Sequence, residues 1–123
     1  MHIAASDRIG YYRCMTEQDA LAALAALAHP TRLATFRLLV RHAPDGLATG
    51  ALADAIGLPQ STFSTHLAVL ARAGLVGAEK QGRHFVQRAD LDRLRRLMVF
   101  LARDCCEGRA ELCSPLLTDL ACC

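Results

Sequence analysis

The stretch of sequence that decides the fold reads QSTFSTHLAVLARAGLV over residues 60–76. Its apolar residues recur at helical spacing and predict an amphipathic helix over residues 60–73, whose inward face consists of Phe63, Leu67 and Leu70. Gly74 supplies the C-terminal stop that is common after such helices. Polar side chains crowd into the N-terminal half of the helix, where free backbone N–H groups also favour phosphates.

The period of the pattern changes directly after this helix. Residues 76–80 and 84–88 read as short strands that flank Gln81-Gly82-Arg83, which together predict a β-hairpin. On the other side, Gly57-Leu58-Pro59 separates the helix from a shorter predicted helix over residues 50–56. Helix, short turn, helix and basic hairpin in this order indicate a winged helix-turn-helix, whose second helix enters the major groove of DNA.

Further helices are expected before this motif. Thr16 is predicted to cap a first helix over residues 19–28, with an apolar stripe of Leu21, Leu24 and Leu27. Pro30 interrupts the chain and opens a second helix that runs to about His42, with an apolar face of Leu33, Phe36, Leu39 and Val40.

Two more caps complete the prediction. Thr49 is expected to cap the 50–56 helix, and Asp90 a long last helix that ends near Gly108, with a stripe of Leu91, Leu94, Leu97, Met98 and Leu101. The predicted fold is mainly α-helical with a small β-hairpin wing, in the order of four helices, two strands and a fifth helix.

Composition and charge agree with this reading. A chain of 123 residues that is 53% hydrophobic and 21% charged forms one globular domain and excludes a disordered or multi-domain protein. The net charge of +2 is mild, but residues 59–88 carry Arg72, Lys80, Arg83 and Arg88 against Glu79 alone. Positive charge therefore gathers in the segment where a DNA footprint is expected.

The candidate DNA-binding residues follow from these positions. They are Gln60, Ser61, Thr62, Ser64, Thr65 and His66 on the helix, and Lys80, Arg83 and His84 around the hairpin tip. Two other readings stay open, because Ser61 or Thr62 could cap the helix and an Arg on a hairpin is often only solvated.

Cysteine usage indicates a reducing compartment. The chain has six Cys, and the segment before Cys14 lacks an apolar core of signal-peptide length. The longest Ala/Leu run, residues 20–28, is too short to cross a membrane. We therefore expect a cytoplasmic protein without a membrane partner, in which clustered thiols bind metals or sense oxidation.

Three segments carry a resemblance to the ArsR/SmtB family of metal-responsive repressors. LAHPTRL at residues 27–33 is similar to the opening of that family's second helix, residues 61–76 to its recognition helix, and Gly82-Arg83 to its wing tip. The resemblance covers about residues 17–108, with Pro59 where a Ser cap is common. It implies a homodimer, formed through the first and last helices, that represses transcription by binding a two-fold operator in double-stranded DNA.

Periodicity and resemblance together suggest a division of the chain, and the resemblance also suggests a sensing site. Residues 1–15 lack clear periodicity and are expected to form an N-terminal arm, followed by the winged helix-turn-helix domain over 16–108 and a Cys-containing tail over 109–123. The segment 104–113 is similar to that of arsenic sensors with three thiols at the end of the last helix, which implies that trivalent arsenic (arsenite) is the inducer and that its ligands are Cys105, Cys106 and Cys113. No permanent cofactor is implied.

The chemistry of these residues suits that ion. Thiolates select soft ions, and trivalent arsenic takes three sulfurs in a pyramid. Adjacent residues on a helix point about 100° apart, so Cys105 and Cys106 can share an ion only where the helix ends, which Gly108 provides. Cys113 can then fold back as the third ligand.

Alternatives remain for the trigger. Methylarsenite needs only two sulfurs, and Cd²⁺, Pb²⁺ or thiol oxidation could act instead. Cys14 could reach across a dimer to complete an intersubunit site, whereas Cys122 and Cys123 have no assigned role. A small thiol oxidoreductase is a further alternative, but the chain lacks a Cys-x-x-Cys motif.

Overall fold

A computed structural model describes residues 15–102, 115 and 118–120 of the chain. The described residues fall into two compact units, of which the first is Thr16–Leu94 and the second includes residues 95–102. Within this part of the chain, no helix has the length and apolar character needed to span a bilayer.

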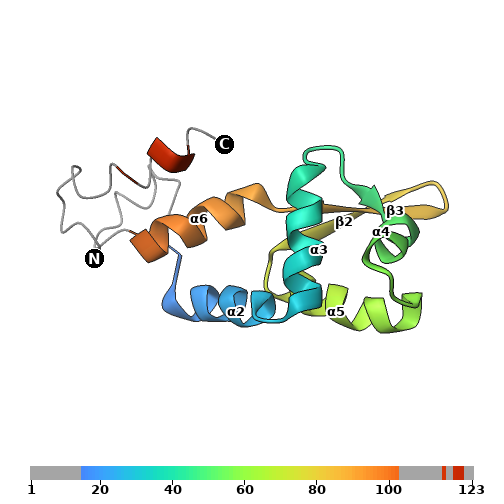
Figure 1. Cartoon of the computed structure of the whole chain (residues 1–123), viewed down its shortest axis with the longest axis horizontal. Helices are drawn as coiled ribbons and strands as arrows, with labels where there is room; N and C mark the ends of the chain where they lie inside the picture. The colour runs from blue at the N-terminus through green and yellow to red at the C-terminus, as the bar shows by residue number, and fades with distance from the viewer. Residues whose placement is uncertain (1–14, 103–114, 116–117, 121–123) are drawn as a thin grey trace. The chain divides into compact units, whose positions relative to one another are not determined.

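The helices and strands follow one another in the order that the sequence predicts, with one additional short strand (Figure 1). In chain order they are α2 (Glu17–Leu27), α3 (Pro30–Arg41), β1 (Leu47–Ala48), α4 (Thr49–Ile56), α5 (Gln60–Arg72), β2 (Val76–Gln81), β3 (His84–Ala89) and α6 (Leu91–Ala102). The prediction of a mainly helical fold with a hairpin wing is confirmed. The sequence did not predict β1, because two residues are too few to show a strand pattern. The predicted end of the last helix near Gly108 and the domain boundary at 108/109 lie outside the described residues.

The helix starts show which predicted caps are real. The Thr16 hydroxyl accepts from the Asp19 backbone N–H at 3.0 Å, and an Asp90 carboxylate oxygen accepts from that of Arg93 at 3.0 Å, so both predicted caps are confirmed. Pro30 is the first residue of α3, as predicted. Thr49 as a cap is wrong: it is already helical, and its hydroxyl is engaged by β3 instead.

The core of the first unit is built around α5. Phe63 and Leu70 are fully buried and Leu67 nearly so, which confirms the predicted inward face. α5 contacts α2, α3, α4 and β2, and the other fully buried side chains include Leu39 of α3, Leu52 of α4 and Leu75, which lies between α5 and β2. This packing fixes which side of α5 is left to solvent.

The predicted stripe of α2 is not the buried one. Ala20, Ala23 and Ala26 are buried, whereas Leu21 is 57% exposed and Leu24 is 38% exposed. α2 contacts both α3 and α5, and small side chains allow helices to approach closely. Of the other predicted apolar faces, Leu33 in α3 and three residues of α6 are also exposed, namely Leu91, Met98 and Leu101.

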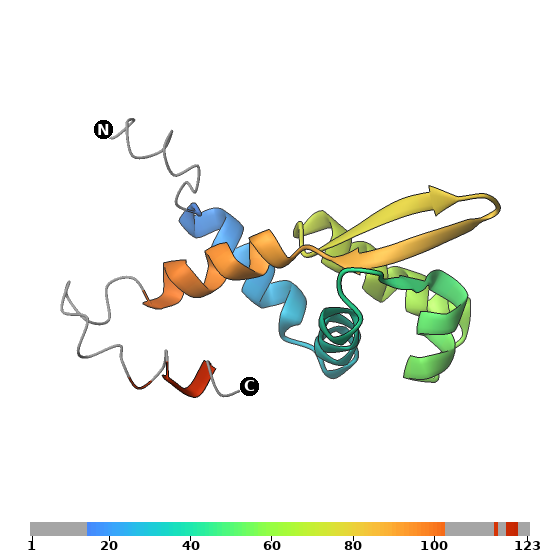
Figure 2. The same cartoon turned by 90° about the horizontal axis from the view of Figure 1, so that it is seen from above.

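The strands form an antiparallel sheet in the order β1–β3–β2, with Gln81 opposite His84 at the hairpin end. Gly46, just before β1, has a φ of +80°, and a Cβ there would overlap the carbonyl oxygen of Gln87. Figure 2 shows the β2–β3 hairpin as a long arm extending on the side of the molecule where α4 lies. The hairpin is therefore placed as a wing beside the helix-turn-helix.

Candidate nucleic-acid interface

The solvent side of α5 carries most of the predicted DNA-binding residues. Those exposed there are Gln60, Ser61, Thr62, Ser64 and Thr65. The N-cap position is Pro59, which makes no side-chain capping bond, so neither Ser61 nor Thr62 is the cap. The first-turn N–H groups of α5 thus lack a capping side chain and stay available to an acceptor such as a phosphate oxygen.

Ser64 is more restricted than its neighbours. Its hydroxyl donates to the backbone carbonyl of Gln60 at 2.9 Å, an intrahelical bond that is common for Ser in helices. The Ser64 oxygen can therefore accept from a partner, while its proton is already engaged.

His66 lies apart from this exposed face. It comes three residues after Phe63 and four before Leu70, and its side chain is half-buried. Its Nδ1 accepts from Nη1 of Arg32 in α3 at 3.3 Å, and its ring lies 4.5 Å from that of His29, tilted by 41°. Burial, followed by the proximity of His29 and Arg32, lowers the pKa of His66 below its ordinary value.

On the wing, the predicted residues Lys80, Arg83 and His84 are all exposed. Arg83 follows Gly82 in the tight turn between β2 and β3, where Gly82 has a φ of +64°. Within the described chain, neither Lys80 nor Arg83 has an ion-pair partner. Their charges therefore remain available to an anionic partner.

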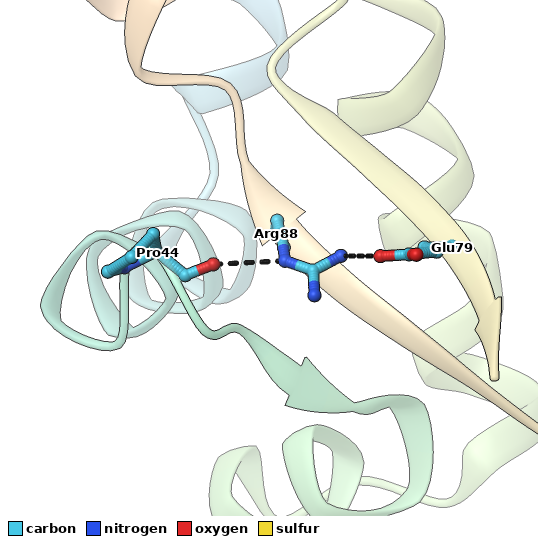
Figure 3. Close-up of polar contacts among 3 residues, drawn as sticks. All are labelled: Pro44, Glu79 and Arg88. Carbon is cyan, nitrogen blue, oxygen red and sulfur yellow. Dashed lines mark hydrogen bonds and ion pairs between the residues drawn. The ribbon is translucent and has the colours of Figure 1, made fainter.

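Arg88 does not add to this free charge. Its Nη1 forms an ion pair with Glu79, and its Nε donates to the carbonyl oxygen of Pro44 at 2.9 Å (Figure 3). Gly77 is the partner of Arg88 in the sheet, so Glu79 is its diagonal neighbour on the same face. The positive patch counted from the sequence is thus reduced to the residues at the wing tip and Arg72.

A groove of about 340 Å³ connects the wing tip to the helices. It is lined by Ala48, Thr49, Gly50, Gln60, Arg83, His84 and Phe85. Candidate residues from the start of α5 and from the wing therefore meet along one surface, as DNA binding by both elements requires.

Phe85 and Gln87 of β3 were not predicted to belong to this region, and the contacts of Thr49 with them were not predicted either. The Thr49 hydroxyl donates to the Phe85 carbonyl at 3.2 Å and accepts from Nε2 of the buried Gln87 at 3.0 Å, which ties α4 to β3. The Phe85 side chain is 50% exposed beside the groove. The alternation along residues 84–88 placed Phe85 and Gln87 on one face of the strand and was the available signal.

The predicted thiol ligands Cys105, Cys106 and Cys113 lie outside the described residues, as do Cys14, Cys122 and Cys123. Among the residues that the structure describes, no three His, Cys, Asp or Glu side chains are grouped to hold a metal ion. The arsenic site stays a prediction.

Comparisons with known proteins agree with this geometry. A helix-turn-helix domain family matches residues 27–76. A crystal structure of a possible transcriptional regulator for arsenical resistance is 32% identical, with a TM-score of 0.58, covering 67% of this chain and 82% of the other. No curated protein matches the chain.

Two further solved structures are similar. An ArsR-like transcriptional regulator from Rhodococcus sp. RHA1 is 25% identical, with a TM-score of 0.64, covering 79% of this chain and 89% of the other. The solution structure of a homodimeric winged helix-turn-helix DNA-binding domain from Mycobacterium bovis, a possible ArsR-family regulator, is 29% identical, with a TM-score of 0.56, covering 75% and 85%.

Proposed function

Since this chain belongs to the ArsR family of winged-helix transcriptional regulators, we propose that it binds operator DNA as a homodimer and releases it when trivalent arsenic binds a cysteine thiolate site. As a DNA-binding regulator it is not an enzyme.

The observation that carries the DNA-binding part is that the start of α5 and the tip of the wing line the same groove. The exposed start of α5 supplies hydroxyl, amide and free N–H groups, and the wing supplies the cations of Lys80 and Arg83, which have no ion-pair partner among the described residues. Short polar side chains on a helix reach base edges in the major groove, whereas cations on a hairpin contact phosphates. This role requires access to the chromosome, so a cytoplasmic location is part of the proposal.

The exposed leucines of α2 support the homodimer. Leu21 and Leu24 form an apolar stripe that leaves the Ala stripe to the core. α6 likewise exposes Met98, Val99 and Leu101. Exposed apolar side chains gathered in this way are typical of protein–protein contacts, and α2 and α6 are the first and last helices of the continuously described stretch, residues 15–102. The Mycobacterium bovis domain is itself homodimeric.

The arsenic part rests on the thiols and on the resemblance. Cys105, Cys106 and Cys113 offer three sulfurs within nine residues of sequence, the number that trivalent arsenic takes. One similar solved structure is a possible regulator for arsenical resistance. Arsenic can release DNA only through a difference in affinity between the free and DNA-bound forms, so DNA must weaken arsenic binding by the same factor.

The test combines binding stoichiometry with DNA release. Fully reduced protein is titrated in native mass spectrometry with arsenite and, separately, with methylarsenite, Cd²⁺ and Pb²⁺. Duplexes enriched from a randomised library are used for fluorescence anisotropy with and without arsenite, and with reduced and oxidised protein. We expect a dimer, one arsenic per chain with three thiol protons lost, and a DNA affinity at least tenfold lower in arsenite. Cys105→Ser should abolish uptake, and Cys14→Ser is the matched control that also lacks one thiol.

The outcomes separate the alternatives. Uptake of arsenite without loss of DNA affinity refutes arsenic as inducer. Loss of arsenite binding but not of methylarsenite binding in Cys113→Ser identifies a two-sulfur use of the site. Selective uptake of Cd²⁺ or Pb²⁺, or release only on oxidation, replaces the inducer but not the regulator. Loss of uptake in Cys14→Ser indicates an intersubunit site.

A further inference from the structure

Arg32 joins three helices at one point. It lies in the first turn of α3, and its Nε donates to the carbonyl oxygen of Ala26, near the C-terminal end of α2, at 2.6 Å. Its Nη1 donates to Nδ1 of His66 in α5 at 3.3 Å, across a separation of 34 residues in sequence. One guanidinium therefore connects α2, α3 and the helix that carries the DNA-binding face.

His29 completes this contact. It is the N-cap of α3, and its Nδ1 accepts from the Thr31 backbone N–H at 3.1 Å. Its ring lies against that of His66, with 4.5 Å between the centroids. Both Nδ1 atoms accept from N–H groups, so each ring, when neutral, carries its proton on Nε2. The capping bond thus fixes the orientation of the His29 ring, which packs against one side of the His66 ring.

A directional contact has a consequence here that apolar packing does not. Phe63, Leu67 and Leu70 hold α5 against the core, but apolar contacts are non-directional and tolerate small rotations about the helix axis. A hydrogen bond requires a defined distance and angle, and one with a charged donor is stronger than a neutral one. His66 flanks the buried side of α5, so a bond there limits rotation of the opposite, exposed side.

We propose that Arg32 and His66 are positioning residues for DNA binding, because their hydrogen bond sets the rotation of α5 about its axis and so the aim of its exposed polar face. The proposal rests on the DNA-binding part of the proposed function and is independent of arsenic. Neither residue needs to touch DNA in this role.

The charges around His66 support the arrangement. The groups that face it are His29 at the start of α3 and Arg32 within α3, and the Ala26 carbonyl of α2 faces Arg32 in turn. A proton on Nδ1 would remove the acceptor and place a second cation beside the guanidinium. The lowered pKa of His66 agrees with a neutral ring that accepts from Arg32.

The test measures affinity and its salt dependence together. Anisotropy with a duplex enriched by the wild-type protein is recorded without arsenite for wild type, Arg32→Gln and Arg37→Gln. Arg37 is exposed on the same helix and controls for the loss of one positive charge. We expect Arg32→Gln to weaken binding about tenfold with an unchanged slope of log affinity against log salt, and Arg37→Gln to weaken it less than twofold. A slope lower by about one identifies Arg32 as a phosphate contact and overturns the proposal.

A second pair of variants keeps the test decisive if Arg32→Gln does not fold. Gln at position 66 still offers an acceptor to Arg32, whereas Leu packs but offers none. We expect His66→Gln to retain affinity within about threefold and His66→Leu to lose about tenfold, with both folded by circular dichroism. Equal affinities of these two variants overturn the proposal. Failure of the wild type to enrich any duplex overturns DNA binding itself as well.

The pH profile distinguishes positioning from simple stabilisation. Because the pKa of His66 is lowered from its ordinary value of about 6.5, the ratio of wild-type to His66→Gln affinity should stay constant above about pH 6.5 and fall as the pH is lowered further, since only the His loses its acceptor. His42→Gln, which replaces an exposed His at the end of α3, should show no such change relative to wild type. A ratio that already falls above about pH 6.5, or one that stays constant throughout the acid range in which the protein remains folded, contradicts the positioning role.

Discussion

Replacing Thr49 by Val measures how firmly the wing is tied to α4. Val has nearly the shape of Thr, but it cannot bond to the Phe85 carbonyl or to Nε2 of Gln87. The hydrogen bond to the Phe85 carbonyl is exposed, so a water molecule can replace the Thr49 hydroxyl there. Gln87 is only 7% exposed, so its amide N–H is left buried without a partner. An unsatisfied buried polar group costs about 1–3 kcal/mol, and we expect Thr49→Val to destabilise the fold by about 2 kcal/mol.

Urea unfolding followed by circular dichroism checks this value. For a slope of about 2 kcal/mol per molar urea, the midpoint should fall by about 1 M. Protein concentration is held fixed, because unfolding of a dimer depends on it. Thr49→Ser keeps the hydroxyl and should cost less than about 1 kcal/mol, the value of one methyl group.

The double variant Thr49→Val/Gln87→Leu decides whether the reasoning is right. It removes both polar partners, so no buried donor is stranded, and it should be more stable than Thr49→Val alone. A single variant within about 0.5 kcal/mol of wild type, or a double variant that is less stable than the single one, would refute the assignment of the cost to Gln87.

Three further predictions concern the wing, the turn before β1 and pH. Gly46→Ala should lose at least about 1 kcal/mol, because its positive φ and its approach to β3 exclude a Cβ, whereas Gly50→Ala, with open space around it, should be neutral or slightly stabilising in urea unfolding. Arg83→Gln should lower the salt slope of DNA binding by about one, whereas Arg88→Gln should leave it unchanged because that guanidinium is held by its neighbours. The lowered pKa of His66 means that folding favours the neutral ring, so its contribution is fully present above about pH 6.5 and is lost as the pH falls through the lowered folded-state value. Urea midpoints should therefore drop less in acid for His66→Gln than for wild type, and an equal drop would contradict the linkage.

A helix and its buried face could be predicted where the sequence offers only one apolar stripe at helical spacing, and not where it offers several. α5 was predicted to within one residue, because only one set of apolar residues recurs at helical spacing and Gly74 follows it. In α2 every third residue forms an apolar stripe in each of three registers, so periodicity could not choose among them; these stripes are Ala20/Ala23/Ala26, Leu21/Leu24/Leu27 and Ala22/Ala25. Close contact with α3 and α5 chose the smaller side chains.

In the candidate site too, features set by neighbouring residues in sequence could be predicted, whereas contacts between distant segments could not. Exposure of the polar residues on α5 followed from its inward face and was predictable. The neutralisation of Arg88 was not, because it requires the strand register that makes Glu79 a diagonal neighbour. The half-burial of His66 was available in the sequence, since it lies at helical spacing from Phe63 and Leu70. Its bond to Arg32 was not, because it spans 34 residues.

If the hydrogen bond between Arg32 and His66 sets the rotation of α5 within one protomer, a consequence follows for induction. In the proposed function arsenic acts through the difference in DNA affinity between the arsenic-free and arsenic-bound states, and Arg32 then contributes equally to both. Arg32→Gln should weaken DNA binding with and without arsenite by the same factor, so the ratio of the two affinities is unchanged from wild type. Anisotropy of the four combinations measures this ratio directly. A ratio that collapses toward one in the variant would show that rotation of α5 is itself what the inducer changes, and would refute the separation of aiming from sensing.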